Sequence, residues 1–366
     1  MKFLLPICIL LMVSCSDPQT LKEVFSDHDI LIGAAVNVDE IAGRTPKAQE
    51  VIANNFNAIV AENCMKQETI APEEGKYDFA DADRLVEFGE QHGLTVTGHC
   101  LLWHSQAAPW FYEAPEGGEL TRELMIDRIR EYITTVVTRY KGRIKGWDVI
   151  NEAVLDDGQL RDTPLLRIIG PDYFEIAFKI AHEADPDAEL YLNDFSMAKP
   201  AKRAKYVEII NDLKQAGCRI DAIGMQSHNG GDYPDLAEYE QSIEDFAACG
   251  VKVMMTELDL NILPQPEQFA GGANVGDIYR YRPELDPYKD GLPKEAEQLF
   301  EQRYLEFFKI YRRHADDISR ITLWGVSDRT SWLNDWPVKG RTSYPLLFDR
   351  DYNPKPVVKK IIDLFR

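Results

Sequence analysis

The stretch RELMIDRIREYITTVVTRYKGRIKGWDVINE, residues 122–152, decides the fold because two hydrophobic periods follow one another in it. Residues 122–140 carry apolar side chains at helical spacing from Met125 to Tyr140, which predicts an amphipathic helix. Residues 144–152 form a short, mostly apolar run, which predicts a buried strand. A helix that is followed at once by such a strand is the repeating unit of α/β proteins.

The same alternation recurs along the chain. Residues 81–92, for example, open on acidic side chains, repeat apolar ones and stop at Gly93, as an amphipathic helix does. Eight β/α units in one domain predict an α/β fold, the (β/α)8 TIM barrel. A doubly wound open sheet is the alternative, but it would usually carry a G-x-G-x-x-G phosphate turn, and the chain has none. The eight predicted strands are residues 30–36, 56–62, 94–103, 144–152, 189–194, 220–228, 251–259 and 318–326.

Composition limits the partners of the chain. Its 366 residues are 45% hydrophobic and 28% charged, which fits a large globular domain and excludes a disordered or fibrous chain. Asp plus Glu total 61 against 41 Lys plus Arg, so the net charge is -20. Nucleic acids and anionic membrane surfaces would be repelled by this charge.

The beginning of the chain has the pattern of an export signal. Lys2 and an apolar run too short to span a bilayer predict a signal peptide in residues 1–14. Cys15 between two serines resembles a bacterial lipoprotein signal, in which this cysteine would be lipidated; plain secretion is the alternative. We therefore expect a tether in residues 15–27 and a folded domain in residues 28–366. Lipid anchoring would place the protein at the outer membrane, on its periplasmic or cell-surface side.

The other cysteines of the mature chain could be paired or free. In an oxidising compartment four cysteines could form two disulfides, with three connectivities. A chain of this length does not need such cross-links. Buried free thiols are the simpler expectation for Cys64, Cys100, Cys218 and Cys249.

Reactive side chains follow the ends of the predicted strands, where barrel enzymes carry their catalytic groups. Glu152 and Glu257 stand out because apolar runs bring each of them to the rim, and a carboxylate there costs desolvation unless it is paired or used. Each could instead pair with a Lys or Arg of a neighbouring loop. Other polar and aromatic candidates at these strand ends are Glu62, Asn63, Lys66, His99, Trp103, His104, Gln106, Asn151, Gln226, His228, Asp259 and Trp324.

Two carboxyl groups are what cleavage of a glycosidic bond needs. One is protonated and gives its proton to the leaving oxygen, and the other is ionised and meets the positive charge at the anomeric carbon. Repulsion between the two would raise the pKa of one of them. Indole rings at Trp103, Trp324 and Trp332 suit the apolar faces of sugar rings, although each could equally belong to a core.

Five strings of the sequence carry a family resemblance: GHCLLWHSQAAPW (98–110), WDVINE (147–152), TELD (256–259), LWGVSDRTSWL (323–333) and GRTSYPLLFD (340–349). In order and spacing they resemble the motifs of glycoside hydrolase family ten, the retaining endo-1,4-β-xylanases. The similarity extends from about residue 30 to the C-terminus. It implies a (β/α)8 catalytic domain that hydrolyses internal β-1,4-xylosidic bonds of xylan by double displacement.

The same resemblance implies roles for individual residues. Glu152 would be the acid/base and Glu257 the nucleophile, roughly 5 to 5.5 Å apart. Asn151 would bind the 2-hydroxyl of the sugar being cleaved, and His228 would orient Glu257. The remaining substrate-binding residues would be Gln226 in the same subsite, Glu62, Asn63 and Lys66 one sugar toward the non-reducing end, His99, Trp103 and Gln106 around the cleavage-site sugar, and Trp324 and Trp332 as aromatic lid and floor.

Several neighbouring residues have more than one interpretation. His104 is either a structural hydrogen-bonding residue or a ligand contact. Asp148 could support the site or pair within the barrel, and Asp259 could support it from behind. Asn193 and Asp194 end the fifth predicted strand, and either could serve the leaving-group subsites.

Three alternatives to xylan hydrolysis stay open. The same residues could act on another β-1,4 glycan, such as a glucan, because glucose and xylose differ by one hydroxymethyl group. A non-hydrolytic, glycan-binding surface lipoprotein would be favoured by the loss of Glu152 or Glu257, and both are present. A metal-dependent barrel hydrolase would need clustered His and Asp ligands, and the first predicted strand has no H-x-H pair. We expect a monomer that uses neither metal nor cofactor and takes xylan or xylo-oligosaccharides as its partner.

Overall fold

The computed structural model describes residues 19–268, 276 and 278–366. The predicted signal peptide and the predicted lipidation of Cys15 therefore lie outside the described residues.

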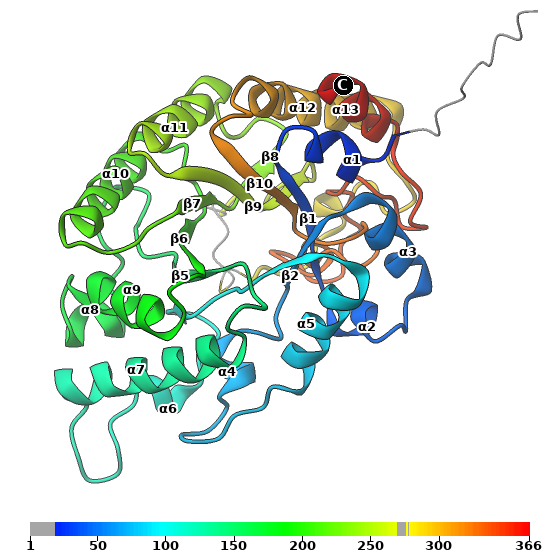
Figure 1. Ribbon diagram of the computed structural model, residues 1–366. Coiled ribbons are helices and arrows are strands. Elements are labelled where there is room, and N and C mark those ends of the chain that lie inside the picture. The colour runs from blue at the N-terminus through cyan, green and yellow to red at the C-terminus, as the bar shows by residue number, and fades with distance from the viewer. Residues whose placement is uncertain (1–18, 269–275, 277) are drawn as a thin grey trace, which may run out of the picture.

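The strands form a parallel barrel, as predicted, and not an open doubly wound sheet (Figure 1). Their order is β3-β2-β1-β10-β9-β7-β6-β5-β4, with β8 paired to β9. β3 and β4 are two parts of one predicted strand, residues 94–103, and they pair with β2 and β5 respectively. Bonds from Lys145 N to Val96 O (2.8 Å) and from Gly98 N to Gly146 O (2.9 Å) complete the ring. The strands are β1 (Leu31–Val36), β2 (Ala58–Ala61), β3 (Thr95–Thr97), β4 (Leu102–Trp103), β5 (Gly146–Asn151), β6 (Glu189–Asp194), β7 (Ala222–Met225), β8 (His228–Gly230), β9 (Lys252–Asn261) and β10 (Ile318–Leu323).

Helices surround this ring (Figure 1). The helix predicted at residues 81–92 is α5, which stops before Gly93, where φ is 65°, a left-handed value that glycine adopts freely. The helix predicted at residues 122–140 is α7. The helices are α1 (Leu21–Ser26), α2 (Val38–Ile41), α3 (Pro46–Asn55), α4 (Gln67–Ile70), α5 (Ala80–His92), α6 (Pro109–Tyr112), α7 (Arg122–Arg139), α8 (Pro164–Ile168), α9 (Tyr173–Ala184), α10 (Pro200–Gln215), α11 (Leu236–Ala248), α12 (Lys294–Arg313) and α13 (Pro356–Phe365), with short 3-10 turns η1 (Pro283–Leu285) and η2 (Trp332–Asn334).

Left-handed residues explain why two strands are shorter than predicted. Glu152 follows β5 with φ of 56°, and Ser227 separates β7 from β8 with φ of 65°. Such values take the chain out of the extended region. The strands predicted at residues 144–152 and 220–228 therefore end or break at these positions.

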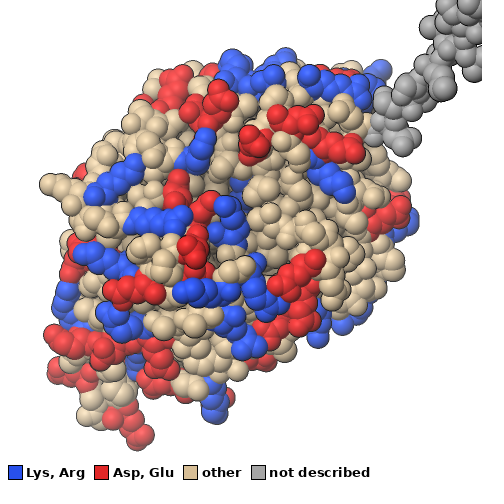
Figure 2. Space-filling model, in the orientation of Figure 1, with Lys and Arg blue, Asp and Glu red and all other residues tan. Residues whose placement is uncertain are grey.

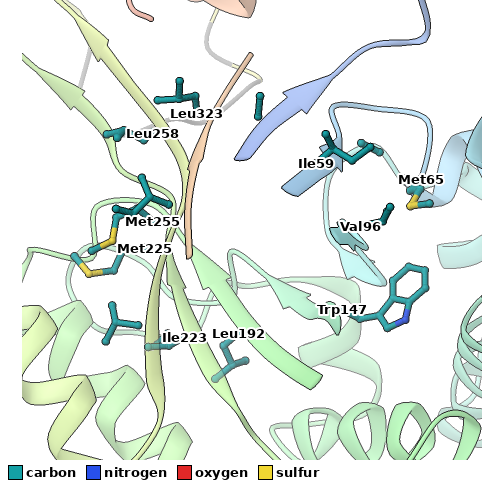
Figure 3. Close-up of a cluster of buried hydrophobic side chains, with 14 of the residues drawn as sticks. Ile59, Met65, Val96, Trp147, Leu192, Ile223, Met225, Met255, Leu258 and Leu323 are labelled. Atoms are coloured by element: carbon teal, nitrogen blue, oxygen red, sulfur yellow. The ribbon is translucent and has the colours of Figure 1, made fainter. Parts of the chain in front are cut away.

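Alternate residues of the strands pack in two different places. Outward side chains, such as Leu192 and Met255, are buried in the main core between the ring and the helices (Figure 3). Their neighbours on the opposite face point into the ring. There Tyr191, Ala222 and Met254 form a small cluster of their own. This part of the ring is packed with side chains, as the interior of a TIM barrel generally is.

The folded domain begins earlier than predicted. Residues 21–26, which the sequence placed in a tether, form α1, and its Leu21 and Phe25 are buried. The rings of Phe25 and Phe365 lie 4.2 Å apart, and a nitrogen of His28 lies 2.8 Å from the carbonyl oxygen of Phe365. An apolar stripe on a short segment therefore docks the beginning of the domain against α13.

The four described cysteines carry free thiols, as expected. Cys64 and Cys100 are buried, whereas Cys218 and Cys249 are partly buried. Burial raises the pKa of the Cys64 thiol to about 12, so this group stays protonated.

The surface shown in Figure 2 carries acidic and basic side chains side by side. Acidic groups gather over the loop between α6 and α7, where Glu113, Glu116 and Glu119 are exposed. This face has no broad basic patch of the kind that binds nucleic acid. In the described part of the chain, no helix is both long and apolar enough to cross a membrane.

Candidate active site

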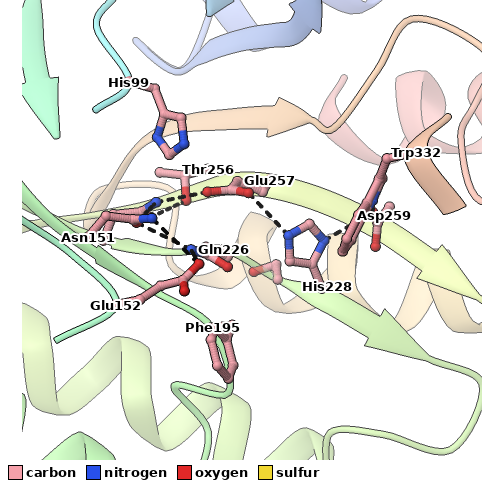
Figure 4. Close-up of polar contacts among 12 residues, drawn as sticks. His99, Asn151, Glu152, Phe195, Gln226, His228, Thr256, Glu257, Asp259 and Trp332 are labelled. Atoms are coloured by element: carbon pink, nitrogen blue, oxygen red, sulfur yellow. Dashed lines mark hydrogen bonds and ion pairs between the residues drawn. The ribbon is translucent and has the colours of Figure 1, made fainter. Parts of the chain in front are cut away.

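One pocket of about 140 Å³ contains every side chain that the sequence predicted to be catalytic or substrate-binding. It lies at the C-terminal ends of the strands, where barrel enzymes place their chemistry. Figure 4 shows its polar centre. The lining residues are Glu62, Asn63, Lys66, His99, Trp103, Gln106, Asn151, Glu152, Gln226, His228, Glu257, Trp324 and Trp332.

Glu152 is the first residue after β5, and its carboxyl group is buried. Its Oε2 accepts a hydrogen bond from Nε1 of Trp103 at 2.9 Å, and its Oε1 accepts one from Nε2 of Gln226 at 3.1 Å. Burial raises the pKa of Glu152 to about 7, and the negative charges of Asp194 and Glu257 add to this, against the lowering effect of the two hydrogen bonds. Glu152 can therefore hold a proton near neutral pH.

Glu257 projects from β9 into the same pocket (Figure 4). Its Oε1 accepts a hydrogen bond from Nδ2 of Asn193 at 2.8 Å, and its Oε2 lies 3.1 Å from Nε2 of His228. Burial alone would raise its pKa, but the contact with His228, the charges of His99 and His228, and the Asn193 amide together lower it. Glu257 is therefore ionised where Glu152 is still protonated.

His228 holds Glu257 from behind. Its Nδ1 lies 3.0 Å from Oδ2 of Asp259, so both ring nitrogens face carboxylate oxygens and donate when the ring is protonated. Burial lowers the pKa of His228, but Asp259 and Glu257 outweigh burial and raise it to about 10. Asp259 also accepts a hydrogen bond from Nε1 of Trp332 at 2.8 Å. One carboxylate thus fixes both the imidazole and an indole wall of the pocket.

Amide side chains connect the two carboxyl groups. Besides binding Glu257, Asn193 donates to Oδ1 of Asn151 at 3.0 Å, and that oxygen also accepts from Gln226 at 3.3 Å. Gly224 leaves room for this arrangement, because a Cβ there would lie 2.4 Å from Oδ1 of Asn193. Asn193, for which the sequence left a leaving-group role open, is therefore a residue that holds Glu257.

The wall near β2 presents charged and amide groups to the pocket. Nζ of Lys66 donates to Oδ1 of Asn63 at 2.9 Å and to Oε1 of Gln106 at 2.7 Å, and it lies 5.1 Å from the centre of the Trp103 ring. Burial raises the pKa of Glu62, although Lys66 and Asn63 lower it in part. Such a wall offers both donors and acceptors to sugar hydroxyl groups.

His99 is held by a buried carboxylate. Its Nδ1 lies 2.9 Å from Oδ2 of Asp148, and its ring meets Trp324 edge-on with the ring centres 5.4 Å apart. Asp148, whose place the sequence left open, therefore orients a pocket histidine. His104 is different, because it does not line the pocket, and burial together with the charge of Arg161 lowers its pKa to about 4. Its ring lies outside the pocket, and its buried Nδ1 has no hydrogen-bond partner, so the structure supports neither the hydrogen-bonding role nor a contact with a ligand in this pocket.

Sequence reasoning missed two residues beside Glu152. Nε of Arg161 donates to the carbonyl oxygen of Glu152 at 2.9 Å. Phe195, which is buried one residue after β6, lies near Glu152 in Figure 4. Arg161 ends the hairpin of residues 153–161, and no motif marks it. The position of Phe195 directly after a strand end, in contrast, is a signal that the sequence contains.

The described residues contain no group of three His, Cys, Asp or Glu side chains that could hold a metal ion. The alternative of a metal-dependent barrel hydrolase therefore finds no ligand set in this part of the chain.

Comparison with known proteins agrees with the fold. The sequence model of glycosyl hydrolase family 10 matches residues 20–364. The chain is 57% identical over 346 residues to endo-1,4-beta-xylanase A of Xylanibacter ruminicola, which covers 94% of this chain and 93% of that protein. A family 10 endoxylanase structure from a sugarcane soil metagenome superposes with a TM-score of 0.89 at 42% identity, covering 95% of this chain and 100% of that one. A structure in complex with xylotriose superposes with a TM-score of 0.82 at 34% identity, covering 94% of this chain and 99% of that one. On its sequence and its barrel, the chain belongs to glycosyl hydrolase family 10.

Proposed function

We propose that the protein is a retaining endo-1,4-β-xylanase, which hydrolyses internal β-1,4-xylosidic bonds of xylan. The observation that carries the proposal is the opposite shift of two buried carboxyl groups in one pocket. The pKa of Glu152 is raised to about 7, and the pKa of Glu257 is lowered. Such a pair supplies a proton donor and an ionised nucleophile at the same pH.

The reaction takes two steps. First, Glu257 attacks the anomeric carbon, the glycosidic carbon–oxygen bond breaks, and Glu152 gives its proton to the departing oxygen. This leaves the sugar as an ester on Glu257. Glu152, now a carboxylate, then takes a proton from water, and the water attacks the anomeric carbon and frees Glu257. Asn151 binds the 2-hydroxyl of the reacting sugar, and His228 keeps the nucleophile in place.

The shape of the cleft supports cleavage at internal bonds. A groove of about 660 Å³ adjoins the pocket and shares His228 and Trp332 with it. Asn229, Tyr233 and Asn261 also line this groove. A cleft that continues beyond the reacting sugar can hold a polymer on both sides of the bond that is cut.

The test is the release of reducing sugar from β-1,4-xylan and from carboxymethylcellulose, by the wild type and by Glu257→Ala and Glu152→Ala. We expect the wild type to be active on xylan and to release its first product in the β configuration, as NMR would show. In Glu257→Ala we expect this activity to fall by about 10³-fold or more. Glu240→Ala, on the surface helix α11, is the matched control and should behave as the wild type. Equal activity on both polymers would favour the glucanase alternative, whereas binding of xylan without release would favour the binding protein.

We further propose that the protein is exported and anchored to the outer membrane by a lipid on Cys15, because the first residues have the pattern of a lipoprotein signal. Labelling with a clickable fatty acid in a bacterial host should modify the wild type and not Cys15→Ala. Protease treatment of intact cells would then distinguish the cell surface from the periplasm. An unlabelled wild type found in the medium would support plain secretion instead.

We also propose that it works without metal or cofactor, because the side chains of the pocket suffice for both steps, and we propose that it is a monomer. Activity should survive treatment with EDTA. Light scattering after gel filtration should give the mass of one chain.

A further inference from the structure

The backbone of Glu152 has an unusual conformation. Its φ of 56° is a left-handed value that a glutamate rarely adopts. A residue stays in such a conformation only where its surroundings hold it there, and such residues cluster at active sites. The direction of its side chain, and hence the position of the acid/base carboxyl group, depends on what holds this residue.

Two hydrogen bonds hold the backbone of Glu152, one at its N–H and one at its carbonyl oxygen. Its backbone N–H donates to the carbonyl oxygen of Asn193 in β6 at 2.9 Å, so that side belongs to the sheet. Its carbonyl oxygen accepts from Nε of Arg161 at 2.9 Å, so that side depends on a side chain nine positions further along the chain.

Arg161 is itself well fixed. It ends a hairpin of residues 153–161, in which its own backbone N–H donates to the carbonyl oxygen of Ala153 at 2.7 Å. Its guanidinium carbon lies 5.8 Å from the centre of the Phe195 ring, which Figure 4 shows near Glu152. The guanidinium can face an aromatic ring and direct Nε at a carbonyl at the same time, which an ammonium group cannot copy.

We propose that Arg161 is a positioning residue for the acid/base: by holding the carbonyl group of Glu152, it keeps the carboxyl group directed at the scissile oxygen. Without this bond the peptide can relax toward an ordinary φ, and the carboxyl oxygens leave Trp103 and Gln226. This inference rests on the proposed function and adds one residue to its machinery. It makes proton transfer depend on Arg161, while attack by Glu257 does not.

Substrates whose leaving groups differ in basicity separate a loss of proton transfer by Glu152 from a loss of attack by Glu257. Xylan needs protonation of its leaving oxygen, whereas dinitrophenolate departs without a proton. In Arg161→Gln we expect kcat on xylan to fall about 100-fold, the size of a lost general-acid contribution, with KM little changed. The burst of dinitrophenolate from dinitrophenyl β-xylobioside should keep the wild-type rate. The steady state after the burst should slow, and azide, a nucleophile that needs no general base, should restore it.

Two further variants complete the experiment. Arg161→Lys should give an intermediate loss on xylan, and it provides the same comparison if Arg161→Gln does not fold. Arg219→Gln is the matched control, because Arg219 also donates to a backbone carbonyl, that of Pro186, but precedes β7 at the end of the barrel away from the pocket. It should leave the xylan rate and the burst unchanged.

The outcomes distinguish this inference from the proposed function. A wild type that is active on xylan, together with an Arg161→Gln that keeps its xylan rate, would overturn the inference alone. A burst that falls as far as the xylan rate would also overturn it, because Arg161 would then support the whole site. A wild type with neither xylan activity nor a burst would refute the proposed function and this inference with it.

Discussion

Replacing Glu257 by Gln should lower the pKa of Glu152. The substitution removes a negative charge from the pocket while keeping the shape of the side chain and an oxygen for Asn193. The pKa of Glu152 is now about 7, and the charge of Glu257 is one of its causes. Without that charge the ionised form of Glu152 becomes less unfavourable, and the carboxyl group titrates at lower pH.

The size of the effect follows from the charges. Two unit charges about 5.5 Å apart, the separation typical of retaining glycosidases, interact by about 3 kcal/mol at an effective dielectric constant of about 20. This energy equals about two pKa units. Burial and the charge of Asp194 contribute more to the raised pKa than Glu257 does, and they stay in the variant. We therefore expect the pKa of Glu152 to fall by about one unit in Glu257→Gln, with about two units as the upper limit.

The measurement is a carbon-13 NMR titration of labelled glutamate carboxyl groups in the wild type and in Glu257→Gln. The resonance of Glu152 is assigned by its loss in Glu152→Gln. Glu240→Gln provides a control, since it removes a carboxylate that is paired with Arg313 on the surface. A pKa of Glu152 that stays where it is, or rises, in Glu257→Gln would refute the electrostatic reasoning.

Three further predictions follow from the same structure. The profile of kcat/KM against pH should have its alkaline limb near pH 7, where Glu152 loses its proton, and its acid limb below pH 4.5, where Glu257 gains one; a profile flat through pH 7 would contradict this. Gly224→Ala should lower xylan turnover about 10-fold to 100-fold, because its Cβ would lie 2.4 Å from Oδ1 of Asn193 and displace the amide; wild-type turnover in a folded variant would show that the amide is not needed. Glu40→Gln should stabilise the protein at pH 8 but not below pH 4.5. Burial raises the pKa of Glu40 from 4.5 to about 7, so the folded chain binds this proton more tightly than the unfolded chain does, and the free energy of unfolding falls as pH rises through this window. The variant should avoid this loss, which amounts to up to about 3 kcal/mol of the free energy of unfolding. If urea unfolding at pH 8 shows no gain in stability for the variant, the raised pKa of Glu40 is contradicted.

The fold was predictable because strand and helix periods differ along the sequence. β6 was predicted to the residue, since Glu189–Asp194 is a short run between clear turns. The predicted strand at residues 94–103 was wrong as one unit, because β3 and β4 are separate and the chain leaves the ladder between them. Periodicity reports which residues are apolar, but it does not report a local change of backbone direction.

The pocket was predictable residue by residue, but its supports were not. Glu152 and Glu257 follow apolar runs, and motifs mark the residues around them. Arg161 acts through its contact with a backbone carbonyl, and such a contact leaves no trace in residue type or spacing. The sequence marks Asn193 only as a strand end, because its contact with Glu257 depends on the space that Gly224 leaves on the neighbouring strand. Contacts between strands that are distant in sequence appear only once the barrel is closed.

The packed side chains of Tyr191, Ala222 and Met254 inside the ring have a consequence for how a polymer is bound. The active-site pocket is closed at its bottom by the packed interior of the barrel. A glycan therefore cannot pass through the barrel and must lie across its mouth. Substrate and both products then share one open side.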